Sequence, residues 1–174
     1  MKSRVRFAIT LAGAVLCVLP NLATAQSGPG DSQGGQAAAI EGTQSEDKAQ
    51  VRHSVEAFYK SFNSHSFDRV SEFTTDDWNH INPFGGWTRG RDAVLAELRR
   101  VHSSFLKDVS ETIESLSVRF ASDDVAVAIV TSSVSTYYMP DGTKHENERQ
   151  RRCFIVVRRS GRWLIMQDQN TMIR

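Results

Sequence analysis

Apolar residues recur at helical spacing around residue 55. One face of this segment collects Val51, Val55, Phe58 and Phe62. Charged residues fill the positions between them, which is the pattern of an amphipathic helix packed on a core. A capping box over residues 43–46 predicts where the helix begins, and we expect it to end near Asn63. The same spacing predicts a short helix over residues 66–73 and another over residues 91–105.

After residue 115 the apolar spacing changes from helical to alternating. Leu116, Val118 and Phe120 alternate with polar residues, and residues 125–130 form a continuous apolar strand. Further strands are expected at the following places: an extended segment over 78–84, a long strand through 152–157, and a last strand over 163–171. Tight turns at 123–124, 140–142 and 160–161 separate the last four strands. Helices followed by a meander of strands predict an α+β domain, with N-terminal helices packed on an antiparallel sheet.

Two of these strands are apolar at consecutive positions rather than alternate ones. Residues 125–130 and 154–157 both show this pattern, although an antiparallel strand with one wet face should alternate. The helices can cover only one face, so we expect a second subunit to cover the other, giving a homodimer through the sheet face. The alternative is an ordinary central strand that one chain covers by itself.

The first 25 residues have the organisation of a secretory signal peptide. Lys2, Arg4 and Arg6 precede a mostly apolar run over residues 7–19, and Ala23–Ala25 is a small-x-small cleavage signature. The run is shorter than the ~20 residues that span a bilayer. We therefore expect cleavage after Ala25, export to the periplasm or the exterior, and no stable membrane anchor afterwards. A retained anchor is the alternative.

The rest of the chain divides into a linker and one domain. Residues 26–46 are rich in Gly, Ser and Gln, which predicts a flexible tether, and residues 47–174 have the length of one compact domain. The formal net charge of the full chain is +1, from 21 basic and 20 acidic residues. Such a balance argues against nucleic-acid binding. Cys153 is the single cysteine beyond the signal segment, and an inert thiol is expected in its apolar strand.

The sequence lacks several common motifs that indicate a cofactor or a catalytic class. It has no glycine-rich phosphate loop, no Gly-x-Ser-x-Gly, no Cys-x-x-Cys and no His-Glu-x-x-His. Asp76, Asp77 and His80 lie close together, but no second cluster supports them as metal ligands. We therefore expect neither a cofactor nor a metal.

Residues 79–91 place polar side chains among large aromatic ones, as a ligand pocket does. The candidate ligand-binding residues in this segment are Asn82, Phe84, Trp87 and Arg91. An equally simple interpretation is structural, with Gly85–Gly86 forming a turn and Trp87 filling the core.

His102 is the best candidate for general acid/base chemistry, because imidazole titrates near neutral pH. It shares the apolar face of the 91–105 helix, where a buried structural histidine is the alternative. Tyr59 on the first helix would add a hydroxyl to the same cavity. Asp168 and Asn170 share one face of the last strand, and Asp168 facing solvent is the alternative to Asp168 as a proton carrier.

Several of these motifs together resemble the SgcJ/EcaC family, a SnoaL-like branch of the nuclear-transport-factor-2-like superfamily. The resemblance rests on Asn82–Trp87 with Gly90–Arg91, His102 with Phe105, Gly161–Ile165, and Gln169–Asn170–Thr171. One departure is Ser66, where relatives often carry an Asp after the histidine. The resemblance implies a cone: a strongly curved antiparallel sheet whose mouth is closed by helices, as in a cystatin-like roll, around a mostly apolar cavity. It also implies one or two acid/base groups and no cofactor.

The expectation from the sequence is an exported SnoaL-like domain that binds a small apolar or polycyclic ligand in the cone cavity. In its catalytic form it would be a cofactor-independent isomerase, cyclase or dehydratase, with His102 moving the proton. Asn82, Tyr59 and Asp168 would polarise the substrate or stabilise an enolate. The walls and remaining contacts would come from Phe84, Trp87, Phe105, Arg91, Gln169 and Asn170. The alternative is a non-catalytic ligand-binding or dimerisation module.

Overall fold

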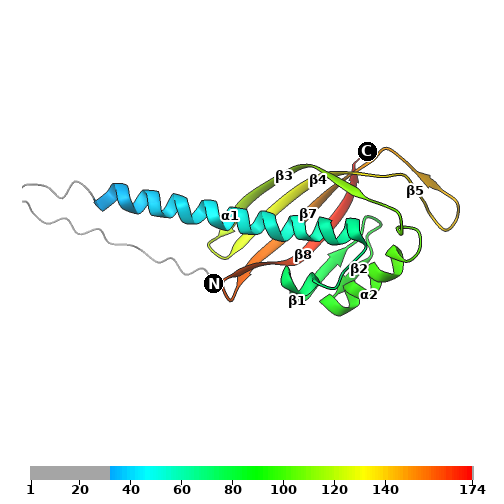
Figure 1. Cartoon of the computed structure of the whole chain (residues 1–174), viewed down its shortest axis with the longest axis horizontal. Coiled ribbons are helices and arrows are strands. Elements are labelled where there is room, and N and C mark those ends of the chain that lie inside the picture. The colour runs from blue at the N-terminus through cyan, green and yellow to red at the C-terminus, as the bar shows by residue number, and fades with distance from the viewer. Residues whose placement is uncertain (1–31, 174) are drawn as a thin grey trace, which may run out of the picture.

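The computed structural model describes residues 32–173, which form a long helix laid across a curved sheet (Figure 1). The helical elements are α1 (Ser32–Ser64), the short 3₁₀ helix η1 (Val70–Glu72) and α2 (Arg91–His102). The strands are β1 (Thr74–Ile81), β2 (Trp87–Arg89), β3 (Glu111–Ser122), β4 (Val125–Val134), β5 (Tyr137–Tyr138), β6 (Lys144–His145), β7 (Glu148–Arg159) and β8 (Arg162–Ile173). The predicted α+β class is confirmed.

Six strands form the main sheet in the order β2-β1-β8-β7-β4-β3. The predicted meander is present, since β3, β4, β7 and β8 pair antiparallel in sequence order. The expectation of a wholly antiparallel sheet is wrong in one place: β1 pairs parallel with β8, so the sheet is mixed. Register shifts at residues 113–115, 120–122 and 155–156 mark bulges, which bend strands and help the sheet to curve.

The inner face of the sheet carries the hydrophobic core, on which α1 packs. Val51 and Val55 of α1 are fully buried, and Phe58 sets its ring edge-on to Trp78 and Phe154 at centroid separations of 6.2 and 5.5 Å. Burying such aromatic side chains stabilises a fold by roughly 2 kcal/mol or more each. The apolar face predicted for the first helix is therefore the face that meets the sheet.

Helix boundaries differ from the sequence-based expectation. The first helix begins at Ser32 rather than at the capping box, so residues 32–46 of the expected linker belong to α1. Three consecutive alanines at 37–39 favour helix propagation from the packed part of α1. The helix predicted over 66–73 shortens to η1. The second long helix ends at His102, where the Ser104 hydroxyl bonds the carbonyl oxygens of Arg100 and Val101. The expected signal peptide and residues 26–31 lie outside the described residues.

The outer face of the sheet is apolar along its two central strands. Val125, Val127 and Ile129 of β4 are partly exposed there, beside Cys153 and Ile155 of β7. Their neighbours along β4, Ala126 and Ala128, are fully buried on the inner face. The consecutive apolar positions in the sequence therefore belong to two faces, one covered by α1 and one uncovered in this single chain.

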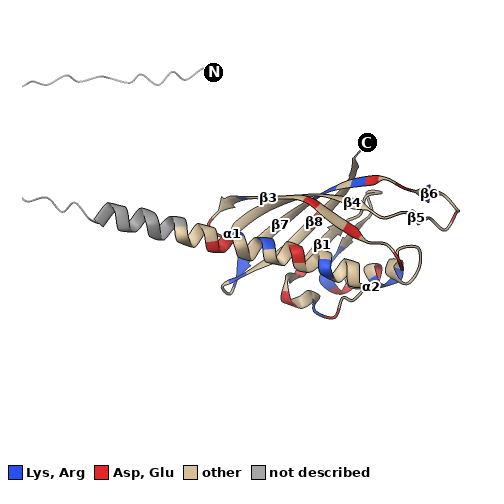
Figure 2. Cartoon of the chain, turned by 45° about the horizontal axis from the view of Figure 1, so that its top comes forward, with Lys and Arg blue, Asp and Glu red and all other residues tan. Residues whose placement is uncertain are grey.

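Charged side chains are mixed by sign over the surface. Figure 2 shows basic and acidic residues interspersed along α1 and α2 rather than gathered by sign on the face in view. Within residues 32–173 no helix has the length and apolar character needed to cross a membrane.

Candidate functional site

A cavity of about 190 Å³ opens at the end of the sheet between α2 and the β5–β6 hairpin. Its apolar walls include Phe62, Leu98, Phe105, Val134 and Met139. Its polar lining residues are His80, Glu97, Glu111, Gln150, Arg152 and Asn170. A cavity of about 150 Å³ is known to accommodate benzene, so this one has room for a single substituted ring. Of the two ligand classes expected from the sequence, small apolar or polycyclic, the small apolar one fits this volume better.

A histidine–aspartate pair lies at the inner end of this cavity. His80 of β1 and Asp168 of β8 are register partners in the parallel pairing, and His80 Nδ1 lies 2.9 Å from Asp168 Oδ2. Trp78 donates its indole N–H to the other carboxylate oxygen, also at 2.9 Å. Because the carboxylate accepts, Nδ1 carries the proton of the neutral ring and Nε2 keeps its lone pair. Among the described residues, the side-chain hydrogen bond of His80 is made through Nδ1, which leaves Nε2 unengaged.

The Asp168 carboxylate is fully buried yet held in its charged form. Burial alone would raise its pKa, but the charge and hydrogen bond of His80, the charge of Arg152 and the Trp78 N–H together hold the pKa below its usual value. Asp168 thus fixes the tautomer of His80 and stabilises the ring when it takes up a proton. A histidine oriented in this way is suited to act as a general base.

Arg152 links this pair to a second buried acid. Its guanidinium lies 3.3 Å from Asp168 and 3.4 Å from Glu111, and Ser132 donates to the other Glu111 oxygen at 2.9 Å. Burial would lower the pKa of Arg152, but Glu111, Tyr59 and Asp168 raise it, so the guanidinium stays charged. Because Arg152 makes only one long contact with each of these two carboxylates, several of its five N–H groups donate no hydrogen bond to either of them.

An amide pair forms the adjoining part of the cavity wall. Asn170 of β8 donates its Nδ2 to Gln150 Oε1 of β7 at 2.5 Å, and both side chains are 5% exposed. The Asn170 Oδ1 atom is buried without a partner. Asn170 therefore lies in the cavity, as the sequence predicted, and Gln150 joins it there.

His102 does not line the cavity. Its ring packs edge-on between Phe62 and Phe67, and its Nδ1 lies 2.7 Å from Nδ1 of His65. Burial, the His65 charge and the Arg152 charge lower its pKa to about 4. The His102 ring therefore stays neutral, and its Nε2 is buried without a partner among the described residues. His102 is a core residue that joins the ends of two helices. The structural alternative for His102 fits this position better than proton transfer does.

Tyr59 also lies behind the cavity wall rather than in it. It is 3% exposed, its hydroxyl is buried without a geometric hydrogen-bond partner, and its ring centroid is 5.9 Å from the Arg152 guanidinium. Burial is the main reason that the pKa of Tyr59 rises to about 12. Tyr59 contributes packing and a dipole near Arg152.

The predicted ligand-binding residues divide between the cavity and other surfaces. Asn82, Phe84 and Phe105 line the mouth; Phe84 is 59% exposed. Asn82 is chiefly a turn residue, because its Oδ1 accepts the backbone N–H groups of Phe84 and Gly86, each at 3.0 Å. Its Nδ2 donates to Glu97, another lining residue, at 3.2 Å.

Three predicted ligand contacts lie elsewhere. Trp87 is 57% exposed and stacks under the Arg89 guanidinium, so it does not fill the core. Arg91 pairs with Asp76 at 2.6 Å and donates to the Thr74 carbonyl oxygen. Gln169 follows Asp168 directly, so alternation along β8 turns it to the outer face, where it is exposed. These three predicted contacts therefore do not line the cavity.

Sequence reasoning did not single out Arg152, Glu111 and Gln150 as cavity residues, and it considered His80 only as a metal ligand. Alternation along β1 puts Trp78 and His80 on one face, and this was a usable signal. The pairing of His80 with Asp168 depends on a parallel contact across 88 residues, which no local pattern reveals.

The suspected metal ligands do not converge. Asp76 and Asp77 are exposed and pair with Arg91 and Arg159, whereas His80 faces the interior. Over residues 32–173, no group of three or more His, Cys, Asp or Glu side chains is arranged to hold a metal ion.

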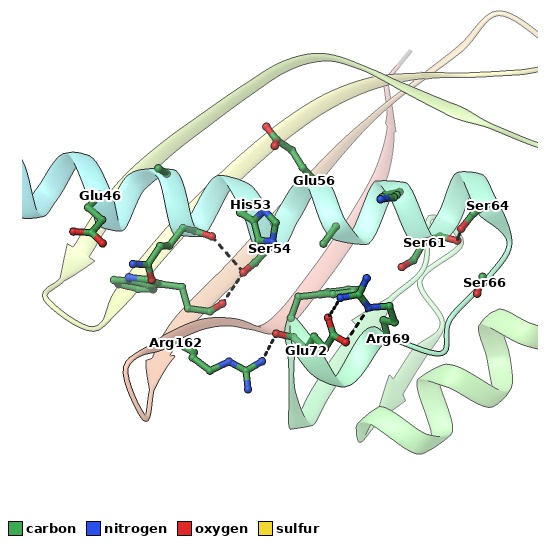
Figure 3. Close-up of a pocket in the computed structure, with 16 residues that line it drawn as sticks. Glu46, His53, Ser54, Glu56, Ser61, Ser64, Ser66, Arg69, Glu72 and Arg162 are labelled. Atoms are coloured by element: carbon green, nitrogen blue, oxygen red, sulfur yellow. Dashed lines mark hydrogen bonds and ion pairs between the residues drawn. The ribbon is translucent and has the colours of Figure 1, made fainter.

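A larger groove of about 910 Å³ runs along the side of α1 (Figure 3). Its titratable side chains are exposed or already paired: His53 and Glu56 lie on the surface of α1, and Arg69 donates to Glu72 at 2.7 and 2.9 Å. Arg162 donates to the Glu72 carbonyl oxygen. This groove offers no oriented acid/base pair, so the smaller cavity is the candidate site.

Solved structures share the fold at low sequence identity. An uncharacterised protein with a cystatin-like fold from Caulobacter vibrioides has 23% identity and a TM-score of 0.71, covering 74% of this chain and 91% of its own. The hexachlorocyclohexane dehydrochlorinase LinA-type3 from Novosphingobium barchaimii has 15% identity and a TM-score of 0.65, covering 75% and 89%. A candidate scytalone dehydratase from Novosphingobium aromaticivorans has 12% identity and a TM-score of 0.63, covering 77% and 89%.

The search of curated proteins found no match. The family model described as a SnoaL-like domain matches residues 55–166, from the middle of α1 to the first half of β8, so Asp168 and Asn170 lie just beyond the matched range. That stretch is well over half of the chain, and the cystatin-like neighbours agree with it. The chain belongs to the SnoaL-like domain family.

Proposed function

We propose that this protein is a cofactor-independent acid/base enzyme of the lyase or isomerase class, acting on a small, mainly apolar molecule bound in the cavity. The observation that carries the proposal is the His80–Asp168 pair, whose unengaged Nε2 belongs to a residue lining an apolar cavity. The fold neighbours named as a dehydrochlorinase and a candidate scytalone dehydratase are in keeping with elimination chemistry.

The reaction begins with proton transfer to His80. Nε2 accepts a proton from an activated C–H of the substrate, and the electron pair of that bond forms a new C=C bond. In elimination, the bond to a leaving group on the adjacent carbon breaks and the group departs with that electron pair. In isomerisation, an existing adjacent C=C breaks instead, and its electron pair takes the proton back from His80 at the far carbon. Asp168 stabilises the imidazolium formed in either case, and Arg152 lies close enough to offset negative charge developing on the substrate.

The test is to incubate the purified protein with a small-molecule extract of its source organism and compare extract and bound fraction by mass spectrometry. The wild type should consume a compound that the His80→Gln variant binds but leaves unchanged. His53→Gln, on the exposed surface of α1, is the matched control and should behave as the wild type. A compound retained unchanged by the wild type would favour the alternative, a non-catalytic carrier. Loss of turnover in His102→Gln but not in His80→Gln would reassign the base.

Three finer proposals accompany this function. The motifs Asn82–Trp87 and Gly161–Ile165 favour the SgcJ/EcaC branch of the family. The uncovered apolar outer face of β4 and β7 favours a homodimer through the sheet. The charged start, apolar run and small-x-small signature of residues 1–25 favour export after cleavage near Ala25.

A further inference from the structure

We propose that the Gln150–Asn170 pair is a subsite for a hydroxyl group, and that the ligand is a single-ring alcohol or phenol. This deepens the proposed function, because it rests on the same cavity being the ligand site. It names the polar group that the ligand must carry, which the histidine–aspartate pair alone does not.

The Gln150–Asn170 pair leaves hydrogen-bonding capacity unused on both residues. Asn170 Nδ2 donates one of its two N–H groups to Gln150 Oε1, and Gln150 Nε2 is not part of this bond. Asn170 Oδ1 is buried without a partner among the described residues. Turning both amides over gives the same result, since Gln150 Nε2 would then bond Asn170 Oδ1 and leave Gln150 Oε1 and Asn170 Nδ2. In either orientation one amide nitrogen and one amide oxygen take no part in the bond between the two side chains, and the bonded nitrogen keeps a second N–H.

A hydroxyl is the smallest group that satisfies both atoms. Its oxygen accepts from the free amide N–H and its proton is donated to the free carbonyl oxygen. A carbonyl group satisfies the donor alone, and a methyl group satisfies neither. Both side chains are 5% exposed, so an unmet donor or acceptor costs free energy that a hydroxyl-bearing ligand recovers.

The cavity sets the size of the molecule that carries the hydroxyl. Its volume of about 190 Å³ admits one ring, and its walls are apolar at Phe62, Leu98 and Phe105. Along β8, Asn170 and Asp168 lie on the same face two residues apart, about 7 Å. A six-membered ring whose hydroxyl group binds the amide pair therefore extends as far as His80, which is hydrogen-bonded to Asp168.

The experiment titrates the full-length protein with cyclohexanol, cyclohexanone and methylcyclohexane and measures each Kd by ¹H–¹⁵N NMR. These probes share a ring and differ in offering a donor and acceptor, an acceptor, or neither. We expect cyclohexanol to bind at least about tenfold more tightly than methylcyclohexane and more tightly than cyclohexanone. The side-chain amide resonances of Gln150 and Asn170 should shift with cyclohexanol.

The double variant Gln150→Met/Asn170→Leu removes both partners together and keeps an apolar fill, so it avoids leaving one amide stranded. It should bind the alcohol and the hydrocarbon equally. Gln169→Met, on the outer face next to Asn170, is the control and should keep the preference. Equal affinities in the wild type, or a preference that survives in the double variant, would overturn the hydroxyl subsite. Neither result would overturn the proposed function, which is tested separately by the loss of turnover in His80→Gln.

Discussion

At the scale of single residues, the inner end of the cavity depends on a buried polar network that runs from His80 through Asp168 and Arg152 to Glu111. Each link joins residues that are at most 5% exposed. Charges at such depth are stable only when each has its partners. This network holds the His80 ring in place and keeps Arg152 charged, and in the proposed function these two residues are the base and the positive charge beside the ligand.

Asp168→Asn should lower the free energy of unfolding by about 3 kcal/mol, because it leaves Arg152 with a single carboxylate and removes the acceptor of His80. Urea unfolding at pH 7.5 measures the loss. Asp77→Asn breaks an exposed pair with Arg159 and should cost less than about 1 kcal/mol. Equal losses in the two variants would show that the buried polar network contributes no more than a surface ion pair.

Acidification should destabilise the protein through His102. Its pKa is about 4 in the folded protein and 6.5 ordinarily, so the unfolded chain binds the extra proton first and stability falls as the pH drops from 6.5 to 4. The loss due to His102 is about 2 kcal/mol at pH 5 and about 3 kcal/mol in full. Urea unfolding at pH 7.5 and pH 5 should show it, and His102→Leu should remove it. His53→Gln should leave the pH dependence unchanged, and an equal effect of both variants would contradict the account.

Single residues were the hardest part of the site to predict. Asp168, Asn170, Asn82, Phe84 and Phe105 were recognised from strand faces and motifs, and all but Asp168 line the cavity. His80 was not predicted to line the cavity, because its pairing with Asp168 joins two strands 88 residues apart. His102 was favoured on its chemistry, whereas its packing against Phe62 and His65 is a tertiary fact.

At the scale of elements, the turn between β1 and β2 shapes the cavity mouth. Asn82 Oδ1 accepts two backbone N–H groups, and its own N–H bonds the Gly86 carbonyl oxygen at 2.9 Å. A Cβ at Gly86 would overlap the Asn82 amide, so the turn requires glycine there. The turn carries Phe84 at the rim of the cavity.

Asn82→Ala should lower the free energy of unfolding by roughly 1–2 kcal/mol through loss of its side-chain hydrogen bonds. It should also weaken binding of cyclohexanol, because Phe84 is no longer held at the mouth. Urea unfolding and the NMR titration give the two readouts. Asn79→Ala, partly exposed on β1 just before the turn, is the control. Unchanged stability and affinity in Asn82→Ala would mean that the turn is held by its backbone alone.

Secondary structure followed closely from the sequence wherever periodicity extended over many residues. The end of α1 fell within one residue of the prediction, and the turn at 140–142 is present, with Gly142 N bonding the Met139 carbonyl oxygen at 2.9 Å. Short elements and helix starts were less predictable, since η1 is stabilised by local contacts and α1 continues through residues without a strong apolar pattern.

At the scale of the whole molecule, the sheet separates a ligand side from an uncovered side. The uncovered side presents Val127 and Ile129 of β4 beside Cys153 and Ile155 of β7. Light scattering coupled to size exclusion should give the mass of a dimer for the wild type and of a monomer for Ile129→Lys, which places a charge in the proposed interface. Glu56→Lys, on the exposed face of α1, should remain dimeric. A wild-type monomer would remove the dimer proposal.

The most direct test of the central claim is the protonation state of the His80 ring, read by long-range ¹H–¹⁵N NMR at pH 8. The account predicts a proton on Nδ1, held by Asp168, and a lone pair on Nε2 whose ¹⁵N resonance moves when cyclohexanol enters the cavity. A proton on Nε2, or a lone pair on Nε2 that does not respond to the ligand, would contradict the claim that His80 is the base of this site.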